Sequence, residues 1–283
     1  MRPELLLAAA LLLTAAGGTA APAGVLDRAK ETGELRIGYR ADARPFSFKD
    51  GQGVAQGYSV DLCRAVAKEA AAATGRPDLR LVEVEVTATD RLEAVPASKV
   101  DLLCEATTVT LSRREAMDFS LLTFATGASL LYRVDGPAKF EDLAGKKVGV
   151  LTGSTTEAGL AKALERAGIE AEVVAVPTHG EGIDRLARGE LAAYFGDGAL
   201  LLYNLLQSPA KDKLRMSEVV LSFEPYALAL PKGDEAFRLV ADRALAGLSR
   251  SGDIARLFER NFGAGAKPGN LVQALWVLNT IPE

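Results

Sequence analysis

Histidine and cysteine are scarce in this chain, which has one histidine and two cysteines among 283 residues. A structural zinc ion takes four such ligands, so these side chains are too few to hold one, and we expect no cofactor. A block of basic residues is also missing and the net charge is -4, so binding to nucleic acid is not expected. An acidic ligand would therefore need a local pocket of positive charge.

Long apolar runs are absent apart from one near the start of the chain, over residues 5–16. The run follows Arg2 and precedes small residues suited to cleavage near Ala20 or Ala21, which is typical of a signal peptide over residues 1–21. A membrane anchor is the alternative, but the run is shorter than the roughly 20 residues that a spanning helix needs. We therefore expect an exported, soluble protein.

The two cysteines, Cys63 and Cys104, are expected to lie close together. Cys63 shares one face of a predicted helix with Val66 and Ala70, and Cys104 ends a predicted strand that such a helix could cover. An even pair in an exported chain favours a disulfide. Two buried free thiols are the alternative.

Strands and helices alternate along the chain, which predicts parallel α/β sheets. The strands at 35–39 and 147–151 each lead into a polar loop, so the same plan is repeated in two halves. Two β-favouring segments, 123–132 and 219–230, are long enough to cross from one lobe to the other. The strands of both lobes would end at a shared cleft, where such sheets bind ligands. The predicted lobes are residues 25–125 with 222–283, and residues 126–221.

One polar loop combines hydroxyl groups with a guanidinium. Thr107 and Thr108 follow the apolar run that ends at Cys104, and Arg113 lies on a predicted helical turn that leads to the Asp-Phe-Ser of residues 118–120. Free N–H groups and hydroxyls beside a guanidinium suit a small carboxylate. An exposed loop with solvated charges is the alternative.

A second polar loop, from Gly153 to Glu157, follows the strand that ends at Leu151 and starts a helix. Ser154 and Glu157 have the spacing of a capping box, and the backbone N–H groups of Ser154 and Thr155 would lie at the positive end of the helix. The loop therefore fits a carboxylate site or only a helix cap.

The loop around Thr108 resembles the amino-acid-binding periplasmic proteins that serve ABC transporters, known as bacterial solute-binding protein family 3. In these proteins Thr or Ser lies five residues before an Arg, as Thr108 and Arg113 do here, and residues 45–48 and 57–62 resemble further family patterns. The resemblance spans roughly residues 25–262. It implies a type II periplasmic binding fold, two α/β lobes joined by two hinge strands, and a periplasmic monomer that delivers its ligand to a membrane permease.

The resemblance also implies how the carboxylate of an amino acid is held. Arg113 and Thr108 would bind it from one lobe, and Thr155 would bind it from the other, with Ser154 nearby. A carboxylate gripped from both lobes would favour the closed cleft.

For the ammonium group of the ligand, the resemblance implies Asp197, helped by the backbone carbonyl of Ala106. As an alternative, Asp197 caps the predicted helix from Ala199 to Leu206. Ala106 and Ala88 stand where the glutamate/aspartate-binding branch often has hydroxyl residues, so some hydrogen bonds of that branch are missing here.

Three side chains match the pattern of that glutamate/aspartate-binding branch: Arg40, Arg91 and His179. The resemblance implies that the two arginines bind a side-chain carboxylate. With Arg113 they would outnumber Asp197 by two positive charges, which suits a ligand with two carboxylates and one ammonium. Because unpaired buried charges are costly, we expect glutamate or aspartate rather than glutamine.

An exported enzyme on the same fold, similar to the cyclohexadienyl dehydratases, is the main alternative. Such enzymes act on cyclic acids with carboxylates, so a cationic cleft does not exclude them. The sequence offers no nucleophile–base pair, however, and His179 alone is a thin basis for general acid–base catalysis. We therefore expect a binding protein. The sensor module of a receptor is a second alternative, but the transmembrane segment that it needs is not found.

Overall fold

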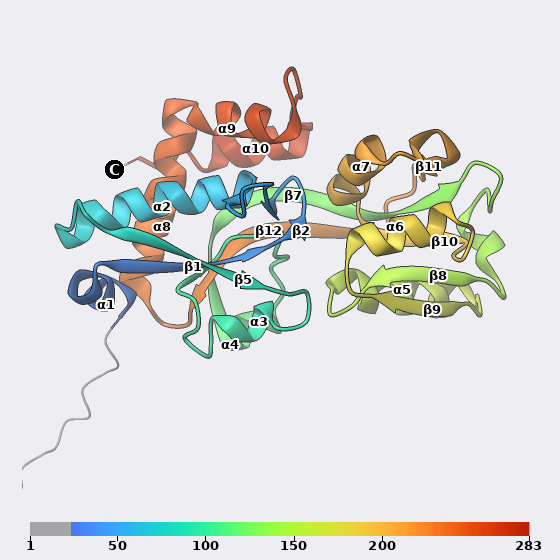
Figure 1. Cartoon of the computed structure of the whole chain (residues 1–283), viewed down its shortest axis with the longest axis horizontal. Helices are drawn as coiled ribbons and strands as arrows, with labels where there is room; N and C mark the ends of the chain where they lie inside the picture. Colours follow the sequence, from blue (N-terminus) through green and yellow to red (C-terminus); the bar gives the residue numbers. More distant parts are fainter. Residues whose placement is uncertain (1–23, 283) are drawn as a thin grey trace, which may run out of the picture.

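The computed structural model describes residues 24–282, so the predicted signal peptide at residues 1–21 lies outside the described residues. The described chain folds into two α/β lobes that lie side by side and are joined by extended strands (Figure 1). The predicted fold class is confirmed. Among residues 24–282, no helix combines the length and apolar character needed to cross a membrane.

The first lobe is built on three parallel strands, with β1 (Glu34–Arg40) between β5 (Arg80–Val86) and β6 (Leu102–Leu103). Successive side chains of a strand point to opposite faces, so Leu102 and Leu103 belong to two different apolar cores. Strand β6 ends at Leu103, one residue before Cys104, where the sequence predicted its end. The other elements of this part of the chain are α1 (Val25–Thr32), β2 (Asp42–Ala43), β3 (Ser47–Lys49), β4 (Ala55–Gln56), α2 (Tyr58–Thr74), α3 (Arg91–Ala94) and α4 (Arg113–Ala116).

The second lobe repeats this plan. Strand β8 (Lys147–Leu151) lies between β9 (Glu172–Val176) and β10 (Ala193–Asp197), and all three are parallel. Neighbouring Tyr194 and Phe195 of β10 again point into separate cores on the two faces. The remaining elements are η1 (Phe140–Leu143), α5 (Thr155–Ala167), α6 (His179–Ala187), α7 (Gly198–Gln207), η2 (Lys211–Lys213) and β11 (Leu214–Met216).

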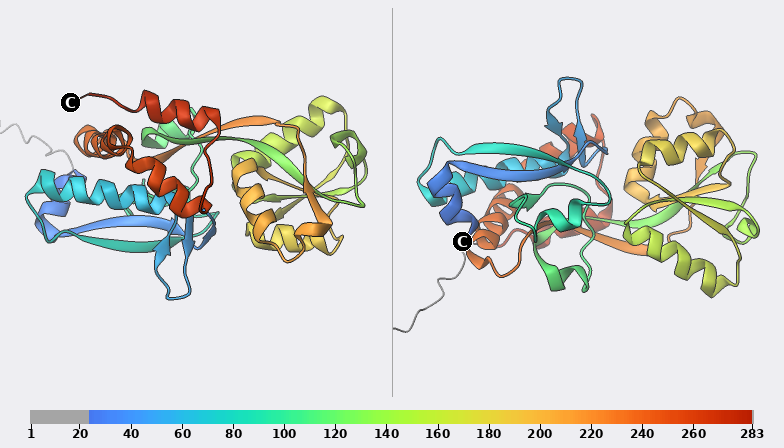
Figure 2. Two further views of the ribbon diagram at one scale, coloured as in Figure 1. Left: turned by 90° about the horizontal axis from the view of Figure 1, so that it is seen from above. Right: turned by 60° about the horizontal axis from the view of Figure 1, so that its bottom comes forward.

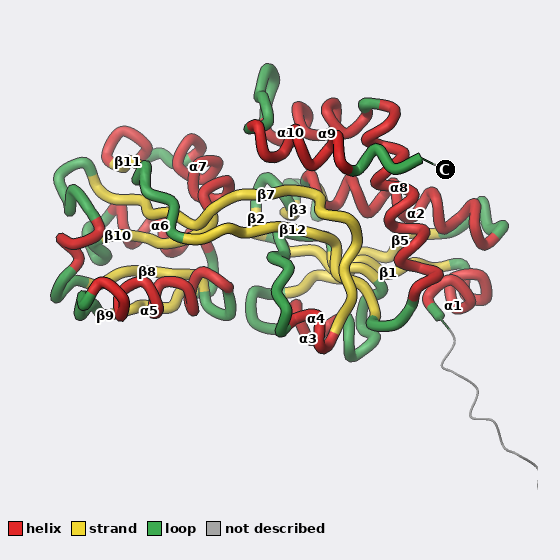
Figure 3. Tube along the Cα trace, turned by 180° about the vertical axis from the view of Figure 1, so that it is seen from behind, coloured by secondary structure: helices red, strands yellow, loops and turns green. Residues whose placement is uncertain are grey.

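Two long strands connect the lobes, β7 (Met117–Arg133) and β12 (Ser222–Pro231). They run antiparallel and pair with each other from Met117 opposite Pro231 to Ala128 opposite Ser222 (Figure 3). At its far end β7 pairs with β10, so one sheet of nine strands continues through both lobes. Because β7 passes between the lobes without a break, the boundaries at 125/126 and 221/222 stay a prediction.

The helical turn predicted before the Asp-Phe-Ser of residues 118–120 is confirmed as α4, a single turn, and the Asp-Phe-Ser lies on β7, which begins directly after α4. Helix α2 starts at Tyr58, and the residue before it is Gly57, whose φ of 125° suits glycine.

Three helices after β12 pack back on the first lobe (Figure 2). Apolar residues at helical spacing predict the first two of them, and the third, over residues 270–278, was not predicted. Within this region Trp276 packs edge-on against Phe258, with ring centroids 5.6 Å apart. On the same side of the sheet, Cys63 of α2 and Cys104 directly after β6 form a disulfide with an S–S distance of 2.03 Å. The three helices are α8 (Glu235–Ser251), α9 (Asp253–Phe262) and α10 (Asn270–Leu278).

Candidate functional site

A cavity lies where strands of both lobes end. Arg40 is the last residue of β1, Ser154 lies just past β8, and Asp197 is the last residue of β10. Parallel strands present their carboxyl ends at the same edge of a sheet, and this topology brings distant segments together. The cavity is lined by Arg40, Ala43, Arg91, Glu105, Ala106, Thr108, Leu151, Ser154, Thr155, Thr156, His179, Asp197 and Leu200.

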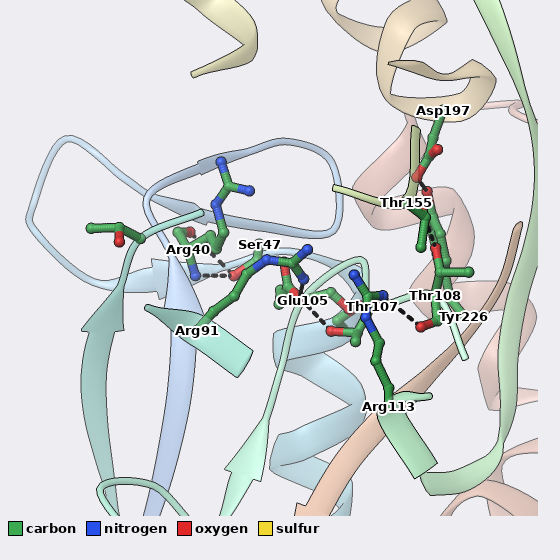
Figure 4. A network of polar contacts seen from close by, with 12 residues as sticks. Arg40, Ser47, Arg91, Glu105, Thr107, Thr108, Arg113, Thr155, Asp197 and Tyr226 are labelled. Atoms are coloured by element: carbon green, nitrogen blue, oxygen red, sulfur yellow. Dashed lines mark hydrogen bonds and ion pairs between the residues drawn. The ribbon is translucent and has the colours of Figure 1, made fainter. Parts of the chain in front are cut away.

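Eight of the nine predicted ligand-binding residues line this cavity, and Arg113 is the one that does not. Its Nη1 donates a hydrogen bond to the backbone carbonyl of Thr108 at 2.6 Å, so Arg113 lies directly behind the lining (Figure 4). Burial, and then the positive charge of Arg91, lower the pKa of Arg113 to about 10. The guanidinium therefore stays charged at neutral pH and is poised for an anion.

Thr108 and Thr155 meet across the gap between the lobes. Their hydroxyl oxygens are 3.4 Å apart, and each hydroxyl donates a hydrogen bond of 2.8 Å to the same oxygen, Oε2 of Glu224. The loop of Thr108 is held in place by β12, because Thr108 bridges to Tyr226 and the N–H of Val109 donates to the carbonyl of Pro225 at 2.8 Å. The two lobes thus contact each other at a pair of hydroxyls that already bind one carboxylate.

Ser154 acts as a helix cap in the structure. Its Oγ accepts a hydrogen bond of 3.1 Å from the N–H of Glu157 and donates one of 2.6 Å to the carbonyl of Leu151. The capping box is incomplete, because the Glu157 carboxylate accepts from the N–H of Gly153. Thr156, which the sequence reasoning missed, is buried against the cavity beside Ser154.

Asp197 is buried and has one carboxylate oxygen to spare. Its Oδ2 accepts a hydrogen bond from the hydroxyl of Tyr226, whereas its Oδ1 has no partner within residues 24–282. Burial, followed by the charge of Glu224, raises the pKa of Asp197 to about 7. Although Asp197 stands at the N-cap of α7, its side chain makes no capping hydrogen bond, so the structure does not support the alternative that it serves as a cap.

Arg40 and Arg91 are both buried, and both are paired with carboxylates. Nε and Nη2 of Arg40 donate three hydrogen bonds of 2.6 to 2.8 Å to Asp42. Nη1 of Arg91 pairs with Oε1 of Glu105, whereas its buried Nε has no partner in the described part of the chain. Both guanidiniums still face the cavity and stay available for further hydrogen bonds.

His179 lies at the start of α6, with its ring buried against the cavity. Nδ1 of His179 and the hydroxyl of Tyr194 are 3.0 Å apart. Burial, and then the charges of Arg40 and Arg91, lower the pKa of His179 to about 3. The ring is therefore neutral at physiological pH and adds no positive charge to the cavity.

The expected surplus of two positive charges is wrong. Buried Glu105 and Glu224 stand in or against the cavity wall and offset two of the three arginines, and Asp42 offsets Arg40 as well. Neither glutamate belongs to the family pattern from which the charges were counted. The sequence did contain one indication of a negative charge near the ligand. Glu105 directly precedes Ala106, a predicted ligand-binding residue, in the same polar loop.

No group of three or more His, Cys, Asp and Glu side chains is arranged to hold a metal ion in the part of the chain that the structure describes. The cavity offers hydroxyls at one place, with the guanidinium of Arg113 behind them, a free carboxylate oxygen of Asp197 at another, and the guanidiniums of Arg40 and Arg91. Such a set can bind a small molecule that carries both carboxylate and ammonium groups.

Comparisons with known proteins place the chain in a family. Residues 35–264 match the model of the bacterial extracellular solute-binding proteins, family 3, and the chain belongs to this family. It is 30% identical over 261 residues to the glutamate/aspartate import solute-binding protein of Salmonella typhimurium, covering 92% of this chain and 86% of that protein. It is 32% identical over 253 residues to the L-glutamate/L-aspartate-binding protein of Pseudomonas aeruginosa, covering 88% and 83%.

Among solved structures, the chain is similar to an ancestral amino-acid-binding protein described as a precursor of cyclohexadienyl dehydratase. The two are 26% identical with a TM-score of 0.73, and the match covers 85% of this chain and 100% of the other. The family and these relatives identify the chain as a solute-binding protein.

Proposed function

We propose that this protein captures an acidic amino acid, glutamate or aspartate, by closing its two lobes, and delivers it to the permease of an ABC transporter. The observation that carries the proposal is the presence of buried Arg40 and Arg91 in the same interlobe cavity as Asp197. Relatives at 30% and 32% identity, named for glutamate and aspartate, support this choice of ligand.

The α-carboxylate of the ligand binds at the junction of Thr108 and Thr155, with Ser154 nearby and the guanidinium of Arg113 beside them. These hydroxyls already donate to a carboxylate, that of Glu224, which supports their use for another one. Charge-assisted bonds to a guanidinium are shorter and stronger than neutral hydrogen bonds, so Arg113 supplies most of the attraction.

The ammonium group binds Oδ1 of Asp197, with the backbone carbonyl of Ala106 as a second acceptor. A buried carboxylate oxygen without a partner is costly, and an ammonium group supplies both the charge and the hydrogen bond that it lacks. The side-chain carboxylate then reaches Arg40 and Arg91, beside the neutral ring of His179.

Closure follows from the division of these groups between the lobes. Thr108, Arg113 and Arg91 belong to one lobe and Thr155 and Asp197 to the other, so all contacts exist together only when the lobes meet. The ligand stabilises the closed state because it binds that state better, which is a shift of population. We expect a periplasmic monomer whose closed form is recognised by the permease.

The test is isothermal titration of purified protein, stripped of ligand by unfolding and refolding, against the twenty amino acids. We expect glutamate or aspartate to bind with a Kd in the micromolar range or below. If no acidic amino acid binds, the proposal is wrong. Prephenate and arogenate are incubated with the same protein, and turnover of either would point to the dehydratase-like enzyme instead.

A further inference from the structure

Glu105 is a buried carboxylate to which the proposed roles of the cavity assign no task. It lies two residues after β6 and is 1% exposed, and its Oε1 accepts hydrogen bonds from Nη1 of Arg91 and from the hydroxyl of Thr107. Burial would raise the pKa of Glu105, but the charges of Arg91 and Arg40 lower it below its usual range. The cavity therefore contains a fixed negative charge at neutral pH.

This charge stands where the side chain of the ligand is expected. Under the proposed function, Arg91 donates to the side-chain carboxylate of the ligand, yet one of its nitrogens is already bound to Glu105. A second carboxylate at Arg91 would lie within a few ångströms of Glu105, and two like charges in a buried site repel strongly. One guanidinium can neutralise only one of them.

Arg40 does not supply the positive charge that a second carboxylate would need. It donates three hydrogen bonds to Asp42, whose carboxylate is partly exposed and balances the charge of Arg40. Each of the two arginines that face the ligand's side chain thus has its own carboxylate. This part of the cavity presents donors and an acceptor side by side, and both of its guanidinium charges are shared with carboxylates.

We propose that Glu105 is a specificity-determining residue that weakens the binding of side-chain carboxylates at Arg91 and admits side-chain amides, so that glutamine and asparagine enter the same site as glutamate and aspartate. The inference rests on the proposed function. An amide carries no charge to repel Glu105. Its NH₂ group can donate to the Glu105 carboxylate while its oxygen accepts from Arg91 or Arg40. The carboxylate and a guanidinium together therefore satisfy both the donor and the acceptor of the amide.

The experiment is titration of glutamate and glutamine, separately, into the stripped wild type and into Glu105→Gln. In the wild type we expect the two Kd values to agree within about tenfold. In the variant, loss of the competing charge should strengthen glutamate binding by roughly tenfold or more, and glutamine should gain nothing. The ratio of the two affinities is the readout.

Glu93→Gln is the matched control. Glu93 lies on α3 with Arg91 but is exposed, so its substitution removes one negative charge from the helix that holds Arg91 and leaves the cavity unchanged. We expect the affinities for both ligands to change little and by the same factor.

Three outcomes would overturn the assignment. The first is a folded Glu105→Gln variant in which both affinities change equally or glutamate binding weakens, and in that case the proposed function stands. The second is a wild type whose Kd for glutamine is about 1,000-fold or more above its Kd for glutamate. This result needs no variant, so it decides the matter even if Glu105→Gln fails to fold. The third is a wild type that binds neither acidic amino acids nor their amides, and this result removes the proposed function as well.

Discussion

Replacing Asp197 by asparagine should stabilise the protein while abolishing ligand binding. Burial and Glu224 raise the pKa of Asp197 from its ordinary 3.8 to about 7. At about 1.4 kcal/mol per pH unit, this difference corresponds to about 4 kcal/mol of folding free energy that the ionised carboxylate costs. Asparagine can still accept the hydrogen bond from Tyr226 but leaves its NH₂ group without a partner, so we expect a net gain of about 2 kcal/mol.

The cost of Asp197 depends on pH, and the sign follows from the direction of the pKa change. Below about pH 4 the carboxyl is protonated in the folded and the unfolded chain and costs nothing. Between about pH 4 and 7 the unfolded chain releases its proton while the folded chain keeps it, so stability falls as the pH rises. Above about pH 7 the cost is complete. Because the unpartnered NH₂ group costs the variant about 2 kcal/mol at every pH, the variant should be less stable than the wild type by about 2 kcal/mol at pH 4 and more stable by about 2 kcal/mol at pH 8.

The assay is urea unfolding of both proteins at pH 4, 6 and 8, followed by circular dichroism, after any bound amino acid has been removed by unfolding and refolding. Ligand must be absent because it stabilises the folded wild type by mass action. Asp184→Asn is the control, since Asp184 is an exposed residue of the same lobe. A folded Asp197→Asn variant that is no more stable than the wild type at pH 8 would refute the reasoning, as would a constant difference across the three pH values.

The remaining predictions concern the arginines and the disulfide. Arg113→Ala should weaken binding of every amino acid by about 100-fold or more, because a charged guanidinium is lost, and titration calorimetry that still finds micromolar glutamate affinity would contradict its role. Arg40→Ala and Arg91→Ala should each weaken acidic ligands far more than neutral ones, and an equal loss for both classes would remove the arginines from side-chain recognition. Thiol titration of Cys63 and Cys104 should find no free thiol in the native protein and two after reduction.

The fold could be predicted because periodicity and chain order carry most of the information. The run from Tyr58 to Thr74 has one apolar face and forms α2 almost as predicted, and the repeated strand-loop pattern marks β1 and β8. Short elements were less predictable, since α3 and β6 are only one turn and two residues long. Their conformations are set by the segments packed around them more than by their own residues.

The positions of site residues could be predicted where the order and direction of the strands determine them. Arg40, Ser154 and Asp197 come together because each lies at the end of a parallel strand, and a strand end can be read from the chain. The charge balance was not predictable in this way. Glu224 reaches Thr155 from the connecting strand β12, 69 residues away in sequence, so only the packed structure shows the contact.

The pairing of β7 with β12 limits how the two lobes can move. The strands hydrogen-bond to each other along nearly the whole length of β12, so they form a single two-stranded ribbon rather than two independent tethers. Such a ribbon can bend perpendicular to its plane and keep the hydrogen bonds between its strands. Sliding one strand along the other would break those hydrogen bonds. Under the proposed function, the lobes would therefore rock about one line, and closing would return Thr155 to the same partners, Thr108 and Glu224. The proposed permease would then meet the same outer surface each time the protein closes.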